Sequence, residues 1–290
     1  MIISGYSFNK LGPYLVFCDI KNGAYQSFSF ENKNLNIVKK TERHCIGTYD
    51  LSSLSYKPCP HKTKIDLTSK INNCSECFRK IGFNPAFYNA KSISLKQLRY
   101  NELEHCVYMA YFSSSHIKVG IASKKRVYLR LLEQGARAAY ILKTFSDAYL
   151  ARDLEANLCY GGFGFLEKLT SNQKANILCS VNFNEDEAFT CLNGMLQKVN
   201  IMPESKFLNL NSRYFYNHNP ENFSDYISYI KDTDYISGKA VGMVGDIIIL
   251  KQNSDFFAVS IKNFISHKIE LNQNDSFKSY EVQNKQLSLF

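Results

Sequence analysis

The sequence predicts an α+β protein in which a β-hairpin and several helices form a central core, with small antiparallel β segments at both ends of the chain. Three observations lead to this prediction. Apolar and polar residues alternate near both ends, as in half-buried strands. In the middle, two short segments joined by a serine turn are followed by apolar residues spaced three and four apart, which indicates a hairpin and then helices. Between the first β segment and this core lies a stretch rich in cysteine and poor in aliphatic residues.

The N-terminal β segment is expected over residues 1–43, where Gly12 and Gly23 mark turns between alternating runs. Residues 44–95 are predicted to be a separate module, because they have too few apolar residues to build a core of their own. The central core is expected over residues 100–200.

The core begins with a predicted hairpin, whose strands cover residues 107–112 and 117–122 and are joined by a turn of three serines. Helices are expected in three places: residues 125–143, 147–160 and 172–200. The C-terminal segment then covers residues 201–271, with a β-meander over 240–264, and a polar tail covers residues 272–290.

The composition is that of an ordinary folded protein, with 45% hydrophobic and 21% charged residues. No run approaches about 18 apolar residues, and the first residues lack a secretion signal. We therefore expect a soluble, cytoplasmic protein without a membrane partner. Its net charge of +9 suits a phosphate-rich partner such as DNA, and with it an association with the nucleoid.

Four cysteines lie close together in the cysteine-rich module: Cys45, Cys59, Cys74 and Cys77. The spacing of Cys74 and Cys77 lets two thiolates approach one ion from a tight turn, and two more cysteines complete a tetrahedral site. Zinc suits such a site, in a structural role. His61 is an alternative ligand, and a redox dithiol is an alternative use of the last two cysteines. The others are expected to be small core residues: Cys18, Cys106, Cys159, Cys179 and Cys191.

Polar residues recur along the helix expected over residues 125–143. Arg126, Arg130 and Gln134 are four residues apart, and Arg137 extends the same side. Arginine forks on such a stripe are able to contact the phosphate oxygens of DNA. The alternative is an ordinary solvated helix face. On the next predicted helix, Glu155 lies beside the apolar stripe, so its carboxylate is able to point into a cleft and hold Mg2+.

The hairpin and its two helices resemble the core of the GIY-YIG nucleases in order and spacing. Tyr108 matches the tyrosine of the first motif and Gly120 the glycine of the second. Arg130 matches the arginine of the following helix, with Arg126 as a competing alignment, and Glu155 matches the metal-binding glutamate.

One position departs from this pattern, because Lys118 stands where the second motif has its tyrosine. Some divergent branches of the superfamily are similar in this respect. The resemblance implies cleavage of DNA that depends on Mg2+ or Mn2+, with Tyr108, Lys118, Arg130 and Glu155 as catalytic residues. Tyr108 or Lys118 would then deprotonate or orient the attacking water.

A second resemblance covers most of the chain and is to a bacterial family catalogued as domain of unknown function 2797. It rests on the four cysteines, on residues 82–88 and 105–108, and most specifically on the Glu-Gln-Gly-Ala run within residues 130–137. Residues 242–250 fit the closing β segment of that family. The resemblance supports the zinc assignment and implies no particular activity.

The last five residues are Gln286, Leu287, Ser288, Leu289 and Phe290. They resemble the pentapeptide by which bacterial polymerases and repair proteins bind the β sliding clamp. In such a peptide, the last two apolar side chains enter a pocket and the glutamine makes orienting hydrogen bonds. The alternative is a terminal strand that packs on the protein's own core.

Three hypotheses for function follow. The first is a DNA endonuclease of divergent GIY-YIG type, brought to DNA in repair or replication by the β sliding clamp. The second is a DNA-binding adaptor on the same fold that does not cleave. The third is a protein that binds the clamp without needing DNA. The arginine stripe and the net charge favour the first two hypotheses.

Overall fold

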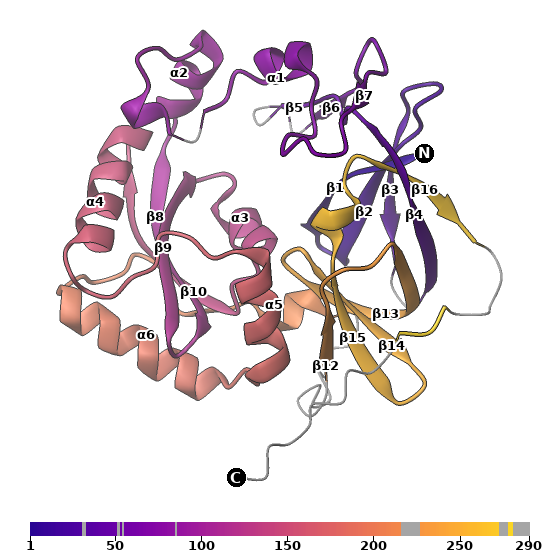
Figure 1. Ribbon diagram of the computed structural model, residues 1–290. Coiled ribbons are helices and arrows are strands. Elements are labelled where there is room, and N and C mark those ends of the chain that lie inside the picture. The colour runs from indigo at the N-terminus through magenta and orange to yellow at the C-terminus, as the bar shows by residue number, and fades with distance from the viewer. Residues whose placement is uncertain are drawn as a thin grey trace.

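The computed structural model describes residues 1–30, 33–50, 53, 55–84, 86–215, 227–272 and 278–280. These residues form two lobes (Figure 1): a β lobe built from both ends of the sequence and an α/β lobe built from its middle. The cysteine-rich segment lies above both lobes in this view. The predicted α+β class is therefore confirmed. None of the helices formed by the described residues has the length and hydrophobicity needed to cross a bilayer.

The β lobe is a sheet of ten strands in the order β12-β15-β14-β13-β4-β16-β1-β2-β3, with β7 also paired to β4. The strands from the N-terminal half are β1 (Ile2–Asn9), β2 (Gly12–Cys18), β3 (Tyr25–Ser29), β4 (Asn34–His44) and β7 (Lys64–Ile65). Those from the C-terminal half are β12 (Ile227–Ile230), β13 (Tyr235–Val244), β14 (Ile247–Gln252), β15 (Asp255–Ser260) and β16 (His267–Leu271). Because β4 pairs with both β13 and β16, the β segments expected at opposite ends of the chain form one sheet.

The cysteine-rich segment contains little regular structure. Its elements are the strands β5 (Thr48–Asp50) and β6 (Ser55–Lys57), the helices α1 (Ser75–Ile81) and α2 (Leu95–Asn101), and the short 3-10 helix η1 (Phe87–Asn89). Its buried residues Cys45, Cys59 and Cys77 cluster with one another, and Ile65 packs against them. The buried cysteines therefore form a small core of their own in the described part of this segment.

The α/β lobe is a sheet of four strands in the order β11-β10-β8-β9, covered by helices on both faces. Its elements are β8 (His105–Ser113), β9 (His116–Ser123), α3 (Val127–Gln134), β10 (Ala138–Phe145), α4 (Ala148–Tyr160), α5 (Ser171–Ser180), α6 (Glu185–Val199) and β11 (Leu208–Asn209). The predicted hairpin is β8 and β9, and the predicted helix over 147–160 is α4, so both are confirmed. The helical prediction over 172–200 is confirmed as the two helices α5 and α6.

Alternate residues of β8 serve two different cores. Val107 and Met109 pack with residues of α4 and α6 on one face of the sheet. Tyr108 and Ala110 face the other way, toward α3, α5 and the neighbouring strand β14 of the β lobe. The second face therefore lies at the junction between the two lobes, and this position decides which side chains can surround Tyr108.

The helix predicted over residues 125–143 ends at Gln134, so the prediction is wrong for the residues beyond it. Gly135 takes a left-handed conformation with φ of 81° and ends α3, and its amide donates to the Leu132 carbonyl at 2.9 Å. The chain then forms β10, in which Ala138 pairs with Tyr111 of β8. Arg137 is consequently not on the polar side of a helix.

The two lobes meet where α3 ends against the turn between β13 and β14. Gly135 and Gly245 approach through their backbones: a Cβ on Gly135 would lie 3.3 Å from the Gly245 nitrogen, and one on Gly245 only 2.9 Å from the Gly135 nitrogen. Both residues have positive φ, which favours glycine. From β1, the Tyr6 hydroxyl donates to the Glu133 carbonyl at 3.2 Å. These contacts fix α3 relative to the β lobe.

Candidate metal centre and candidate active site

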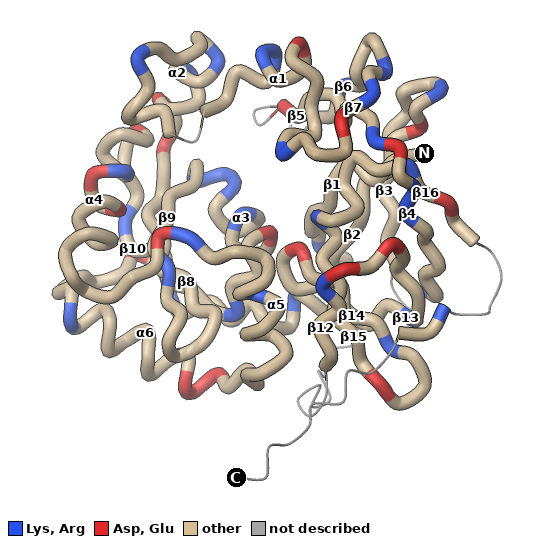
Figure 2. The backbone as a smooth tube through the Cα atoms, viewed as in Figure 1, with Lys and Arg blue, Asp and Glu red and all other residues tan. Residues whose placement is uncertain are grey.

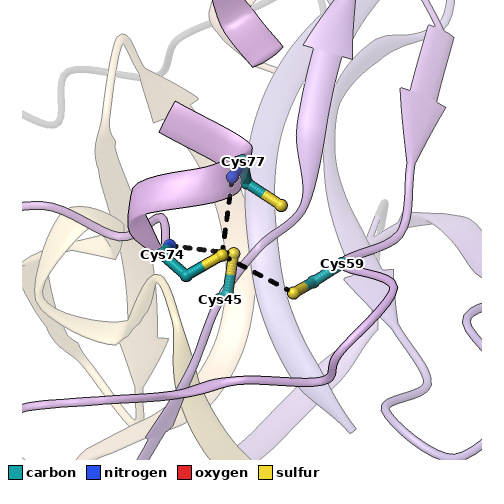
Figure 3. A group of neighbouring side chains, drawn as sticks. All are labelled: Cys45, Cys59, Cys74 and Cys77. Carbon is teal, nitrogen blue, oxygen red and sulfur yellow. Dashed lines mark hydrogen bonds between the residues drawn. The ribbon is translucent and has the colours of Figure 1, made fainter. Parts of the chain in front are cut away.

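The four cysteines predicted to bind metal lie together beside the β lobe (Figure 3). Cys45 directly follows β4, Cys59 follows β6, Cys74 caps α1 and Cys77 lies in its first turn. All four Sγ atoms lie within 4.8 Å of one another, and those of Cys59 and Cys74 are 3.9 Å apart. Four sulfurs at about 2.3 Å from one tetrahedral ion are separated by roughly 3.8 Å. The cluster is therefore able to hold a metal ion such as zinc.

Backbone amides hold the sulfurs in this arrangement. The Cys74 amide donates to Cys45 Sγ at 3.1 Å, and the Cys77 amide donates to Cys74 Sγ at 3.5 Å. After Cys45 the chain turns sharply at Gly47, whose φ is 75°. A Cβ on Gly47 would overlap the Lys57 carbonyl, so only glycine fits this turn.

The surroundings of the cluster suit thiolates bound to a cation. Burial raises the pKa of Cys45 to about 11 and also raises the pKa of Cys77. Burial acts in the same direction on Cys59, but hydrogen bonds from Thr63 and the His61 amide outweigh it and lower the Cys59 pKa to about 6. Buried thiolates are costly without a positive partner, and a divalent ion supplies one.

The sequence left two alternatives open for this segment: His61 as a metal ligand, and a redox role for Cys74 and Cys77. The His61 ring lies outside the cluster, with Nε2 2.7 Å from a Glu76 carboxylate oxygen and 65% of the side chain exposed. Cys74 and Cys77 form no disulfide with each other, and both belong to the four-sulfur cluster. The five remaining cysteines form no disulfide: Cys18 and Cys106 are buried, and Cys159, Cys179 and Cys191 are half-buried.

The second predicted site begins with Tyr108 and Gly120, which are direct cross-strand partners in the hairpin. Tyr108 is 2% exposed, and its hydroxyl accepts a hydrogen bond from Gln134 Nε2 at 2.5 Å. A Cβ on Gly120 would overlap this hydroxyl, so the glycine makes room for the tyrosine ring. Burial raises the pKa of Tyr108, while the positive charge of Arg130 and the hydrogen bond from Gln134 oppose the increase.

Lys118 lies on β9, the edge strand, on the same face of the sheet as Gly120. Its ammonium donates to the Glu167 carbonyl, in the segment that follows α4 and runs beside β9. Burial lowers the pKa of Lys118, and the nearby carboxylate of Glu155 opposes this effect.

Arg126 is the N-cap residue of α3 and Arg130 lies within the helix, and both face Glu133. Figure 2 shows basic (blue) and acidic (red) positions close together around α3. An Arg126 Nη atom is 3.2 Å from a Glu133 carboxylate oxygen, whereas the Arg130 distance is 3.9 Å. Half of the Arg130 side chain is exposed, compared with 14% for Arg126. Arg130 is therefore the arginine that is available to a ligand, and Arg126 mainly neutralises Glu133.

Glu155 is buried on α4 and is held by Arg152, one turn earlier on the same helix, through a short ion pair. The Arg152 guanidinium also donates to the Tyr88 hydroxyl at 3.1 Å and stacks 4.1 Å from the centre of that ring. A second carboxylate, of Glu167, lies 3.7 Å from Arg152. The carboxylate predicted to hold Mg2+ is thus already paired within the protein.

These residues come from four elements, and their charges act on one another. The charges of Arg130 and Glu155 act in opposite directions on the pKa of Tyr108, and both also act on Lys118. Such effects require short separations. The four predicted catalytic residues therefore influence one another electrostatically near β9, the edge strand of the small sheet.

Two of the predicted DNA-contacting residues are buried. Gln134 is buried and turned toward Tyr108. Arg137 is also buried, where its Nε donates to Asn211 Oδ1 at 2.5 Å and its guanidinium lies over the Phe183 ring. Both therefore belong to the interior of the protein. The five residues of the C-terminal motif, 286–290, lie outside the described residues.

Sequence reasoning missed Arg152 and Glu167, and also Lys174 of α5, whose pKa is affected by the charges of Arg130 and Lys118. The three-residue spacing of Arg152 and Glu155 on one helix could have identified the first, because residues at this spacing are neighbours on a helix surface. Glu167 and Lys174 leave no comparable local signal, since they reach the site only through the packing of the segments after α4.

The fold and the cluster define a mixed α+β protein with a four-cysteine centre able to bind a metal ion. Comparison with family profiles shows that this chain belongs to the family described as protein of unknown function (DUF2797), which matches residues 32–269. The match spans both lobes and all four cysteines. Neither the curated proteins nor the solved structures that were compared with the chain gave a match.

Proposed function

We propose that this protein is a DNA endonuclease of divergent GIY-YIG type that depends on Mg2+. The observation that supports this most is the convergence on Tyr108. The hairpin provides Tyr108 and Lys118, α3 provides Arg130 and α4 provides Glu155, and their charges act on one another. The order of elements, hairpin, α3, β10 and α4, also agrees with the resemblance on which the hypothesis rests.

Each residue has a role in the hydrolysis of a phosphodiester. A water molecule attacks phosphorus, and the bond from phosphorus to the leaving oxygen breaks. Lys118 is a candidate base for the water proton, because burial lowers its pKa and favours the neutral amine. Tyr108 can orient the water instead. Arg130, half exposed, would stabilise negative charge on the phosphate oxygens, and Glu155 would hold the metal ion.

The pairing of Glu155 with Arg152 sets a condition on this mechanism. Only 8% of the Glu155 side chain is exposed, and its carboxylate is bonded to the guanidinium. Glu155 would therefore hold Mg2+ only after it gives up Arg152 as its partner. Glu167 lies on the other side of the guanidinium and can keep Arg152 paired after this exchange.

The same ion pair favours a second candidate function, DNA binding without cleavage. With Glu155 neutralised by Arg152 and Lys118 donating to the Glu167 carbonyl, the site presents Arg130 as a phosphate ligand and binds no metal. A protein of this kind would hold DNA through Arg130 and leave it uncut. The third hypothesis, clamp binding without DNA, is not favoured by any contact around Tyr108.

Recruitment by the β sliding clamp is part of the proposal and rests on Gln286, Leu287, Ser288, Leu289 and Phe290. The chain reaches this motif from a fixed point. Tyr280 is 6% exposed, and its hydroxyl accepts a hydrogen bond from the Ser237 amide at 3.0 Å. The motif begins six residues further on. Such a short connection would hold the clamp close to the β lobe.

The test is cleavage of branched, nicked and single-stranded DNA with Mg2+ or Mn2+ at low salt. We expect Glu155→Gln to reduce the rate at least about 100-fold and to leave DNA binding nearly unchanged, because the metal ligand is lost and Arg130 remains. Asp153→Asn is the matched control, since Asp153 is an exposed carboxylate on the same helix. Cleavage that survives in Glu155→Gln would remove Glu155 from the mechanism. Tight binding without cleavage by the wild type would establish the second candidate function.

A further inference from the structure

A lysine that no sequence motif marks lies beside the candidate active site, at the junction of the two lobes. Lys174 belongs to α5, which packs on β8 of the α/β lobe and on β12 and β15 of the β lobe. One turn earlier on the same helix, Ser171 accepts a hydrogen bond from the Lys262 ammonium at 3.1 Å. Lys262 belongs to the β lobe, so α5 brings basic residues of both lobes to one place.

Lys174 is half-buried and lacks a close acceptor. Within the described ranges its ammonium makes no hydrogen bond or ion pair, and the contact found for it is the Phe112 ring, 5.9 Å away. Burial lowers its pKa to about 8. The carboxylate of Asp246 opposes this decrease, but Lys262, Arg130 and Lys118 add to it.

The one carboxylate in this group, that of Asp246, pairs with Lys262, although its Oδ1 atom accepts no hydrogen bond within the described residues. Asp246 is completely buried in the turn between β13 and β14, where one carboxylate oxygen accepts from the Ser260 hydroxyl at 3.0 Å and the other lies 3.4 Å from the Lys262 ammonium. The same turn touches the end of α3 through Gly245. Asp246 therefore holds Lys262 in place and leaves Lys174 without an anionic partner.

We infer that Lys174, with Lys262 beside it, binds a backbone phosphate of the DNA, so that the bound strand continues from Arg130 across the junction to the β lobe. This inference rests on the proposed function, because it extends the same phosphate-binding surface. A phosphate would supply the acceptor that the Lys174 ammonium lacks, and it would reduce the repulsion among the neighbouring cations. The β lobe would then contribute to substrate binding rather than only complete the fold.

The test is DNA binding measured by fluorescence anisotropy at several salt concentrations, with Ca2+ in place of Mg2+ to prevent cleavage. Relative to wild type, we expect Lys174→Gln to weaken binding about fivefold to tenfold at low salt and to reduce the slope of log affinity against log salt by about 1. Lys174→Arg should restore most of the affinity. The matched control is Lys198→Gln on α6, which covers the opposite face of the small sheet.

Two further measurements distinguish a failure of this inference from a failure of the proposed function. The melting temperature of Lys174→Gln should not fall, because burial disfavours the charge that is removed. If Lys174→Gln binds like wild type while Arg130→Gln loses affinity, the strand does not cross the junction, and this inference fails while the proposed function stands. If the wild type binds none of the DNAs, both fail.

Discussion

The cysteine cluster and the group around Tyr108 are both predicted from the sequence. They differ in whether their functional atoms are already bonded to other side chains of the protein. The four cysteine sulfurs lie within 4.8 Å of one another, and backbone amides donate to two of them. Around Tyr108, by contrast, the functional atoms already have protein partners. The tyrosine hydroxyl is bonded to Gln134, and Glu155 is paired with Arg152.

This difference shows what each site requires in order to work. The cysteine cluster needs only an ion, and the ion would add directly to the stability of a segment that has almost no apolar core. The candidate active site needs an exchange of partners before Glu155 can bind metal. We therefore expect tight binding of zinc at the first site and weak, exchangeable binding of Mg2+ at the second.

The largest effect should come from breaking the cysteine cluster. In Cys74→Ser we expect the zinc content to fall from about one ion per chain and residues 44–95 to lose hydrogen-exchange protection first, because metal binding is the folding energy of this segment. Elemental analysis and hydrogen exchange measure the two effects. Cys191→Ser is the control, since Cys191 is a half-buried free thiol on α6. Full zinc content in Cys74→Ser would contradict the four-thiolate site.

A smaller effect should come from filling the space beside Tyr108. Gly120→Ala places a methyl group against the Tyr108 hydroxyl, which has no room to move because Gln134 holds it. We expect the free energy of unfolding to fall by about 1–3 kcal/mol and DNA cleavage to fall with it. Urea denaturation measures the first quantity.

The matched control for this substitution is Gly194→Ala in α6. An added Cβ there meets no neighbouring atom within 4 Å, and alanine is the better helix former. We expect this variant to gain about 0.5–1 kcal/mol. If Gly120→Ala were as stable as Gly194→Ala, Tyr108 would not be confined in the way the structure indicates.

Local patterns in the sequence account for the elements that were predicted correctly. The hairpin has two short segments rich in apolar residues that are joined by a serine turn, and α4 keeps Leu150, Leu154 and Leu158 at intervals of four. The four cysteines could be grouped because their spacing is itself the signal of a metal site. In each case the information lies within a few residues of the chain.

The errors arise where structure depends on distant partners. Residues 138–143 continue the apolar spacing of α3, but Gly135 ends that helix and pairing with β8 turns the segment into a strand. The union of both chain ends in one sheet, through β4, likewise leaves no local pattern. Lys174 joins the candidate site for the same reason, because only the packing of α5 between the lobes places it there.

Removing residues 286–290 should have the smallest effect on stability. It should have no effect on the cysteine cluster or on the group around Tyr108. The described chain is anchored at Tyr280, which stacks 4.8 Å from Tyr235 and accepts a hydrogen bond from Ser237, so truncation six residues later should leave the melting temperature unchanged. Binding to the β sliding clamp, measured by surface plasmon resonance, should be lost. Leu289→Ala together with Phe290→Ala should have the same effect in the full-length chain, since these side chains would fill the clamp pocket. A large drop in melting temperature would instead mean that the tail packs on the protein's own core, and the motif would then be a structural strand.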